Sequence, residues 1–526
     1  MMRFMLPRTA PLPDPTDPTD RLDDSRYLAL AARDARFDGR FFTGVTSTGI
    51  YCRPVCSVRT PRRENCRFFT LAAQAEGAGF RPCLRCRPEL APRALVWSTQ
   101  DAQGILVREA LRLLEADADN PPPQPDHGGP AEGGATMQAL AARLGVSDRH
   151  LRRIFDAALG VSPLQYLQTR RLLTAKQLLT DTDLPVTQVA MASGFQSLRR
   201  FNAAFAQHYG LNPSQLRKTG SARQGPLAGA VRLAYRPPLD VPALLAFFAK
   251  RQIHAVEEVV DTAKEQVLRR TVHWTAGGRE VTGWLSAQFD PVRPLVLLRT
   301  SDSLHPVLPQ VIARVRALLD LDADPSAINA VLHADFPQGD GLRVPGAFDG
   351  FELSVRAVLG QQITVAAART LAQRLVERFG EPIVTPWPAL SRLFPRPAVL
   401  ARAEGDALGQ LGIVRQRQAA IVALARAVDN GQLALHGTAD IPATTAALCA
   451  LPGIGDWTAQ YIAMRALRWP DAFPAGDVAL HKALGVQGQP RPAAAAAEAS
   501  QVWRPWRSYA VVRAWAQGGT ESLSKK

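Results

Sequence analysis

Cysteine is scarce in this 526-residue sequence: there are six, and four of them lie in two short stretches, YCRPVC and RPCLRC. So small and clustered a set excludes a secreted domain held together by disulfides. Long apolar runs are also missing, since none approaches the roughly 20 residues that a membrane helix needs. The opening MMRFMLPRTAPLPDPTDPTD lacks the apolar segment of a signal peptide. We therefore expect a soluble protein of a reducing cytoplasm, with no membrane partner.

Acidic residues are too few to balance the basic ones, and the net charge is +15. The whole excess lies in two segments. Residues 25–97 hold thirteen arginines against five acids, and residues 136–218 hold eleven Lys or Arg against four acids. A surface that is charged only for solubility would spread this charge more evenly. Such concentration is typical of proteins that bind the phosphate backbone of nucleic acids.

Changes in composition along the chain predict a multidomain α+β protein. Residues 101–115 have helical apolar spacing and precede a Pro/Gly linker. Four later runs have the composition of strands, VRLAYRP, VLRRTVHW, EVTGWLSA and LVLLRT, with AGGRE as an expected hairpin turn. The predicted units are a disordered tail at 1–24, a cysteine-rich domain at 25–97, a helix and linker at 98–135, an all-α domain at 136–220, a β-rich domain at 226–335 and a second all-α domain at 336–520.

The four clustered cysteines are spaced Cys52-x3-Cys56 and Cys83-x2-Cys86, with 26 residues between the pairs. Two close thiol pairs joined by a loop fit a tetrahedral Zn²⁺ site with four thiolate ligands. Judged on spacing alone, a closed zinc site that only stabilises a small fold is the more common case. A metal or redox sensor is a further alternative.

The surrounding residues, FFTGVTSTGIYCRPVCSVRTPRRENCRFF and GFRPCLRCRPEL, resemble the N-terminal domain of the bacterial Ada methyl-transfer proteins over about residues 25–90. The resemblance implies that Cys52 irreversibly accepts a methyl group from a methylphosphotriester in DNA. It also implies that one zinc ion is bound by Cys52, Cys56, Cys83 and Cys86. The PCHR motif of a second Ada methyltransferase domain does not occur in the sequence, so we expect no alkylguanine transfer.

This chemistry is consistent with the charges involved. Zinc keeps a thiol deprotonated at neutral pH, and the thiolate is the nucleophile. Four thiolates give the zinc centre a charge of about −2. Methylation of one sulfur removes one negative charge and leaves about −1. DNA affinity should then rise, with nearby arginines binding phosphates. These arginines are Arg53, Arg59, Arg62, Arg63 and Arg67. Cys66 could be a spare thiol, an alternative ligand or a small buried residue, and we expect the last.

Two helix–turn–helix patterns follow, LAARLGVSDRHLRRIFDAA and VTQVAMASGFQSLRRFNAAF. The doubled unit resembles the AraC-type DNA-binding domain, in which each second helix enters the major groove. The side chains expected to meet bases or phosphates are Arg149, His150, Arg152, Arg153, Gln196, Ser197, Arg199 and Arg200. An ordinary helical bundle with solvated arginines is the alternative.

The run LPGIGDWTAQYIAMRAL is a helix–hairpin–helix signature. Gly453 and Gly455 allow a tight turn and close approach to DNA, and the next helix offers free N–H groups to a phosphate. Asp477 lies twenty residues after Trp457. Together with YRPPLDVPALLAFFAKR, LRVPGAFDGFELSVRAVLGQQITVAAA and RPWRSYAVVRAW, this spacing resembles AlkA, the alkylated-purine DNA glycosylase, over residues 230–519.

The resemblance to AlkA implies that the damaged nucleotide is flipped out of the duplex. The base would enter a pocket lined by Trp457, Tyr461, Trp515 and Phe247, where aromatic rings attract a cationic base. Asp477 would stabilise the sugar cation or position water. Gln362 takes the place of the leucine that fills the gap left by the flipped base. The resemblance also allows a monovalent cation at the hairpin backbone.

Two departures narrow the chemistry. Bifunctional relatives carry a Schiff-base lysine where this chain has Trp457, so we expect no lyase activity. Cys449 is the only cysteine after Cys86, which excludes a four-cysteine iron–sulfur cluster there. The side chain of Cys449 is expected to pack.

The sequence thus predicts a bifunctional alkylation-damage protein, cytoplasmic and nucleoid-associated. It would sense methylphosphotriesters in double-stranded DNA, activate transcription with RNA polymerase as partner, and excise purines of the 3-methyladenine class by hydrolysis. The alternative is a transcription regulator whose C-terminal half is catalytically inactive and only holds DNA.

Overall fold

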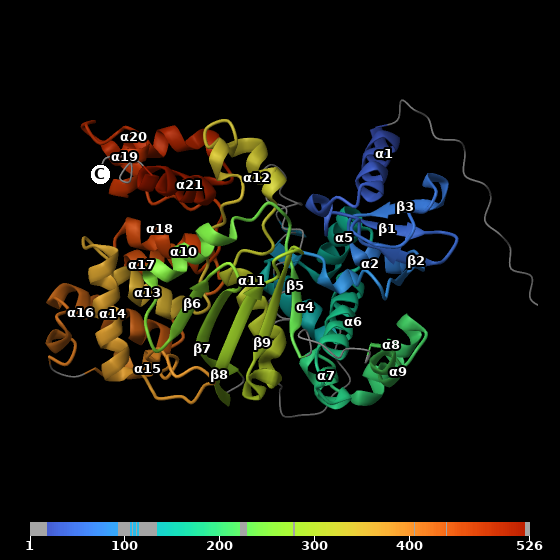
Figure 1. Cartoon of the computed structure of the whole chain (residues 1–526), viewed down its shortest axis with the longest axis horizontal. Helices are drawn as coiled ribbons and strands as arrows, with labels where there is room; N and C mark the ends of the chain where they lie inside the picture. Colours follow the sequence, from blue (N-terminus) through green and yellow to red (C-terminus); the bar gives the residue numbers. More distant parts are fainter. Residues whose placement is uncertain are drawn as a thin grey trace, which may run out of the picture.

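The computed structural model describes residues 18–92, parts of 106–114, and 134–220, 229–276, 279–403, 406–437 and 439–520. The chain folds into a cysteine-rich domain, a helical domain, a β-rich domain and a larger all-α domain (Figure 1). Among the described residues, no helix has the length and hydropathy needed to cross a bilayer.

The cysteine-rich domain is built around a four-stranded sheet in the order β3-β1-β2-β4. Its core is aromatic, with Phe42, Tyr51 and Phe80 buried against one another. The elements are α1 (Pro18–Ala31), β1 (Phe42–Val45), β2 (Ile50–Cys52), β3 (Cys66–Phe69), α2 (Ala72–Gly77) and β4 (Arg81–Pro82).

Helix α1 begins at Pro18, so it crosses the boundary that we predicted between a disordered tail and this domain at residues 24 and 25. The proline at position 18 explains why a helix can start there. Proline is favoured in the first turn of a helix, where its missing N–H costs nothing. Tyr27 of this helix donates a hydrogen bond to the carbonyl of Pro61, which ties α1 to the domain.

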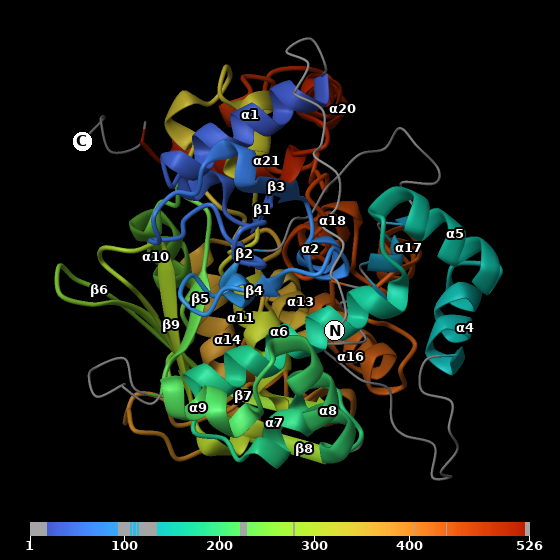
Figure 2. The same ribbon diagram turned by 90° about the vertical axis from the view of Figure 1, so that its right-hand side faces the viewer.

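The helical domain contains the two predicted helix–turn–helix units, with α6 between them (Figure 2). Ser147 and Ser197 each cap the second helix of a unit by accepting a backbone N–H. The predicted helix within 101–115 is helical where it is described, and its apolar side chains pack on the first unit. The helices are α4 (Gly134–Arg143), α5 (Asp148–Leu159), α6 (Pro163–Asp181), α7 (Val186–Ala192), α8 (Leu198–Tyr209) and α9 (Pro213–Gly220).

The β-rich domain is a five-stranded antiparallel sheet in the order β5-β9-β8-β7-β6. All four predicted strands are present, while β6 was not predicted. Its sequence, EEVVD, lacks a clear alternation, and it pairs only at the edge of the sheet. The elements are β5 (Val231–Ala234), α10 (Val241–Arg251), β6 (Glu257–Asp261), β7 (Gln266–Ala276), β8 (Arg279–Phe289) and β9 (Leu295–Thr300).

Helices return after the sheet, as predicted. The first of them, α11, packs in one apolar core with the sheet, and the later helices contribute to two further buried apolar clusters with a cavity between helices of both. They are α11 (Leu308–Leu318), α12 (Pro325–Leu332), α13 (Gly350–Leu359), α14 (Val365–Phe379), α15 (Pro397–Ala401), α16 (Arg415–Asp429), α17 (Ile441–Cys449), α18 (Asp456–Arg465), α19 (Val478–Ala483), α20 (Pro492–Ala499) and α21 (Arg507–Thr520).

Arg236 fastens the cysteine-rich domain to the β-rich domain. Its side chain is almost fully buried, and its guanidinium donates to four main-chain carbonyls. Two belong to the cysteine-rich domain, Asp38 at 2.8 Å and Pro92 at 3.0 Å. The other two, Asp322 at 2.8 Å and Ala323 at 3.2 Å, follow α11. A buried carbonyl without a hydrogen-bond donor costs free energy of folding. This one side chain therefore holds the cysteine-rich domain against the segment that follows α11.

Arg236→Met is therefore expected to destabilise the chain by about 3 kcal/mol, because it leaves four buried carbonyls without their donor. The measurement is the melting temperature by scanning fluorimetry. Arg293→Met, which removes an exposed arginine paired with Asp290, is the control and should leave the melting temperature unchanged. Equal melting temperatures for the two variants would contradict this role.

Candidate functional sites

A parallel strand pair brings the two cysteine pairs together. Cys52 ends β2 and Cys83 follows β4, and these strands pair in parallel with Tyr51 opposite Pro82. The N–H of Cys83 donates to the carbonyl of Tyr51 at 3.0 Å. The sulfurs of Cys52, Cys56, Cys83 and Cys86 all lie within 4.8 Å of one another.

This arrangement fits a zinc ion. A tetrahedron of thiolates with Zn–S bonds of about 2.3 Å has edges of about 3.8 Å. The close approach of the four sulfurs also gives the thiols different pKa values. The pKa of Cys56 is lowered to about 7, chiefly by a hydrogen bond from Cys52. The pKa of Cys52 is raised, chiefly by its hydrogen bond to Cys56. A dication among the four sulfurs would replace these shared protons.

The sulfur of Cys86 accepts the backbone N–H of Arg53 at 3.3 Å. Because a hydrogen bond withdraws electron density from a thiolate, this contact makes Cys86 a weaker nucleophile.

Arg53 does not bind phosphates as we predicted, because its side chain is buried and paired with Asp38. Its guanidinium also donates to the carbonyl of Cys86 at 3.0 Å, so it supports the cysteine loops. Arg59, Arg62 and Arg67 are exposed and accessible to DNA. Arg62 pairs with the exposed Glu64 at 3.6 Å, and the less exposed Arg63 pairs with Asp24 at 3.0 Å.

Cys66 is buried at the start of β3, and burial raises its pKa to about 11. It lies outside the group of four sulfurs. The prediction that it is a small packed residue is confirmed.

The predicted DNA-contacting arginines lie on the exposed faces of the second helix of each unit. Arg152 and Arg153 are exposed on α5, and Arg199 and Arg200 are exposed on α8. Arg152 forms an ion pair with Asp148 one turn earlier, and Arg153 contacts His150. Exposed i,i+4 pairs of this kind are weak, so the side chains can exchange these partners for phosphate.

The hairpin between α17 and α18 has the backbone that its glycines predict. Gly453 has φ +75° and lies against Ala420, while a side chain on Gly455 would meet open space. The amide of Gln361 donates to the carbonyl of Gly453 at 2.9 Å and to the hydroxyl of Thr458 at 3.0 Å. Sequence reasoning missed this support, although Gln361 stands beside the predicted wedge in LGQQIT.

A cavity of about 1020 Å³ opens beside this hairpin and contains the predicted pocket residues. Trp457 and Tyr461 lie one turn apart on α18 with stacked rings, 5.4 Å between centroids and 15° between planes. Trp515 of α21 lies 6.3 Å from Tyr461. Each of the three is half-buried, so the rings are partly accessible from the cavity.

Asp477 caps the short helix α19 at the edge of this aromatic group. One carboxylate oxygen accepts the indole N–H of Trp457 at 3.0 Å. The other accepts the N–H of Leu480 at 2.9 Å and the indole N–H of Trp515 at 3.3 Å. Three donors thus fix the orientation of this carboxylate beside the cavity that it lines.

Phe247 lines the cavity, but cations already lie over its ring. The guanidinium of Arg251 is 3.7 Å from its centroid and that of Arg465 is 4.8 Å away. Arg465 also donates to the hydroxyl of Tyr461 at 2.6 Å. Burial opposes ionisation of Tyr461, yet Arg465 and Arg251 outweigh it, and the net effect is a lowered pKa. A base would compete with these arginines for the ring of Phe247.

Sequence reasoning missed both arginines. Their signal was available, because each follows an aromatic pocket residue by four positions on a helix, Arg251 after Phe247 and Arg465 after Tyr461.

Gln362 is exposed at the mouth of the cavity with φ +53°, between α13 and α14. The left-handed backbone projects it from a turn, a position open to DNA. Cys449 is exposed at the end of α17, so the prediction that it packs is wrong. The last turn of α17 places it on the solvent side, while Leu448 is buried.

Two substitutions of Trp457 separate its contributions. Trp457→Phe keeps an aromatic ring but loses the N–H that orients Asp477, and we expect about 10-fold slower base release. Trp457→Ala loses both, and we expect about 100-fold slower release, since stacking of a base on an aromatic ring is worth ~1–3 kcal/mol. The measurement is single-turnover release of purines from methylated duplex DNA. Equal rates for the two variants would mean that the aromatic ring at position 457 does not contribute to base release.

Four family models match the chain in succession. They are the metal binding domain of Ada at residues 25–89, a helix-turn-helix domain at 140–219, the AlkA N-terminal domain at 230–349, and the HhH-GPD superfamily base excision DNA repair protein at 355–507. A Mycobacterium tuberculosis protein named "Probable bifunctional transcriptional activator/DNA repair enzyme AlkA" is 38% identical over 500 residues, covering 93% of this chain and 95% of that protein. The chain belongs to this AlkA family of bifunctional proteins.

Two further relatives each match part of this AlkA family member. The Escherichia coli protein named DNA-3-methyladenine glycosylase 2 is 34% identical over 54% of this chain and 95% of its own length. The Escherichia coli bifunctional transcriptional activator/DNA repair enzyme Ada is 32% identical over 38% of this chain and 50% of its own length.

Proposed function

We propose that the chain senses methylphosphotriesters in DNA, activates transcription in response, and excises alkylated purines of the 3-methyladenine class. The sensor and the excision pocket lie in different domains. Double-stranded DNA is the shared partner, RNA polymerase is the partner in activation, and the cytoplasmic nucleoid is the place of action.

Zinc held by Cys52, Cys56, Cys83 and Cys86 would keep the nucleophilic sulfur deprotonated at neutral pH. The sulfur of Cys52 attacks the methyl carbon of a neutral phosphotriester. An S–C bond forms, the C–O bond breaks, and its electron pair stays on the phosphate, which becomes an ordinary diester anion. The thioether is stable, so each chain reacts once. Loss of one thiolate charge then reduces repulsion of the DNA backbone near Arg59, Arg62 and Arg67.

The excision step uses the cavity beside the hairpin. The backbone of Gly453 and Gly455 anchors the duplex, and Gln362 fills the place of the flipped nucleotide. The base lies against Trp457, Tyr461 and Trp515. The bond from the sugar to the base breaks with its electron pair leaving on the base. Asp477 stabilises the cationic sugar, and water adds to it and releases a proton.

The oriented carboxylate of Asp477 is the single observation that carries the excision proposal. A module that only holds DNA needs the hairpin but has no use for a carboxylate fixed by two indoles beside an open cavity. The test is chromatography of free bases after the intact chain is incubated with methylated duplex DNA. Released methylated purines are expected. If none are released, the regulator with an inactive half becomes the better account.

The metal or redox sensor makes a different prediction. It requires DNA binding that responds to zinc or oxidant and is indifferent to methylated DNA. The match of residues 25–89 to the metal binding domain of Ada supports a methyl acceptor instead. Mass spectrometry of Cys52 after exposure to methylated DNA separates the two hypotheses.

A further inference from the structure

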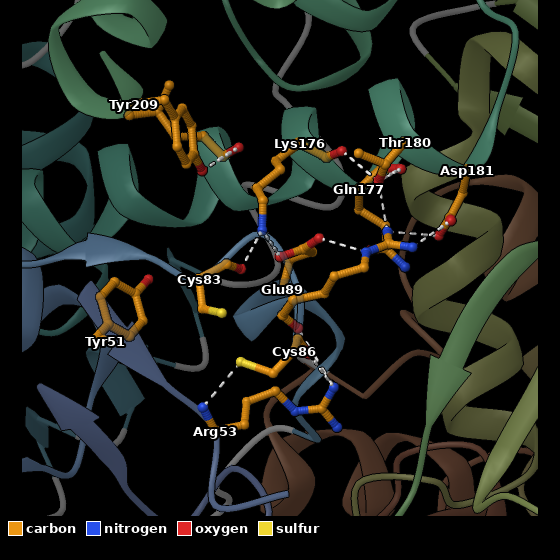
Figure 3. Close-up of polar contacts among 12 residues, drawn as sticks. Tyr51, Arg53, Cys83, Cys86, Glu89, Lys176, Gln177, Thr180, Asp181 and Tyr209 are labelled. Carbon is orange, nitrogen blue, oxygen red and sulfur yellow. Dashed lines mark hydrogen bonds and ion pairs between the residues drawn. The ribbon is translucent and has the colours of Figure 1, made fainter. Parts of the chain in front are cut away.

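Helix α6 of the helix–turn–helix domain lies against the loop that carries Cys83 and Cys86 (Figure 3). The ammonium of Lys176 donates to the carbonyl of Cys83 at 3.2 Å and pairs with Glu89 at 2.5 Å. Arg87 pairs with Asp181 at 2.7 Å and donates to the hydroxyl of Thr180 at 2.6 Å. Every one of these contacts joins the cysteine-rich domain to the same helix.

These charges are enclosed. The side chains of Lys176, Glu89 and Asp181 are at most 1% exposed, and that of Arg87 is 8% exposed. Arg87 also pairs with Glu89 at 2.9 Å, so the four form one continuous ion cluster. Separating the two domains would leave buried charges without partners. The cluster is therefore stable only as a complete unit.

The cysteine loop needs this outside support. Strand β4, which precedes Cys83, has only two residues. Arg87, directly after Cys86, has φ +57°, a left-handed backbone that is unfavourable for a residue with a side chain. The ion cluster with α6 stabilises the loop of Cys83 and Cys86 in this conformation.

A second contact joins the other cysteine pair to the same domain. The carboxylate of Glu76 on α2 accepts the hydroxyl of Tyr51 at 2.8 Å and lies 3.0 Å from His208 of α8. It also accepts the hydroxyl of Thr169 on α6. Tyr51 directly precedes Cys52. Both cysteine pairs are thus connected to α6, and one also to α8, which carries Arg199 and Arg200.

We propose that α6 is a structural part of the cysteine site, with Lys176 and Asp181 as positioning residues that couple zinc binding to the order of the DNA-binding helices. The proposal rests on the zinc centre in the proposed function and deepens it. By linkage, a residue of α6 that tightens zinc binding is itself stabilised when zinc binds. A change at the cysteines therefore reaches α6 and α8 through protein contacts, in addition to its direct electrostatic effect on DNA.

The first test is zinc affinity of the full chain, measured by competition with a chromophoric chelator. Lys176→Met is expected to bind zinc about 10-fold more weakly, because partners in the outer shell of a metal site have effects of this size. Lys176→Arg keeps the charge and should recover part of the loss. Lys264→Met, the same change at an exposed site in the β6–β7 turn, is the matched control. Wild-type affinity in Lys176→Met would overturn the proposal.

The second test needs no variant and so does not depend on whether one folds. Hydrogen exchange of the wild-type chain is followed with zinc bound and after its removal by chelator. Amides of α6 and α8 should exchange at least about 10-fold faster without zinc, while α13 and α14 of the distant all-α domain stay unchanged. Unchanged exchange in α6 and α8 would overturn the coupling. The metal content of the wild-type chain is measured before the exchange experiment. A chain that binds no zinc would overturn the proposed zinc centre itself.

Discussion

Asp477→Asn is expected to slow release of methylated purines at least about 100-fold, the usual effect of removing one preorganised electrostatic group. Asparagine has nearly the same shape and can still accept the N–H of Leu480, so α19 keeps its cap. The variant loses the negative charge that the indoles of Trp457 and Trp515 orient. The measurement is single-turnover base release with enzyme in excess over methylated duplex DNA.

Two controls make this result specific. Asp429→Asn makes the same change at an exposed residue of α16 and should release bases at the wild-type rate. Binding of duplex DNA by Asp477→Asn should be retained, since the hairpin glycines are untouched. An Asp477→Asn chain that releases bases at the wild-type rate would remove Asp477 from the mechanism.

Cys52→Ser is expected to abolish methyl uptake. The wild-type chain should gain the mass of one methyl group on the peptide that contains Cys52 after incubation with methylated DNA. A serine hydroxyl at this position is too weakly acidic to act as the nucleophile. Base release should be unaffected, because the cavity that contains Asp477 belongs to a different domain.

Cys66→Ala is the matched control for this experiment. Cys66 is a buried cysteine of the same domain, outside the group of four sulfurs, and its raised pKa keeps it protonated. This variant should take up one methyl group like the wild type. A methyl group found on Cys56, Cys83 or Cys86 would contradict the choice of Cys52.

Local patterns predicted much of the fold because the periodicity of helices and strands is a local property. The helix–turn–helix units, the four predicted strands and the hairpin follow from spacing, caps and glycines within a few residues of one another. Strand β6 was missed because its five residues gain their conformation from pairing with β7. Helix α1 was missed because Pro18 and its acidic neighbours have the composition of a disordered tail.

The sequence predicted which residues gather at the candidate sites, but only some of the contacts that those residues make. Spacing predicted that the four cysteines gather, as they do. The resemblance to AlkA drew attention to Trp457 and Asp477, which are in contact. Contacts between distant segments leave no such signal. Nothing near Arg53 in sequence indicates that Asp38 buries it, and nothing near Cys83 indicates Lys176, which lies 93 residues away.

One chain is expected to perform both methyl uptake and base excision. Incubating the intact chain with methylated duplex DNA and analysing a single sample in two ways measures both activities. We predict one methyl group on Cys52 by mass spectrometry and free methylated purines by chromatography. Methyl uptake without base release would contradict this expectation and leave a regulator with an inactive C-terminal half, and base release without methyl uptake would contradict the sensor.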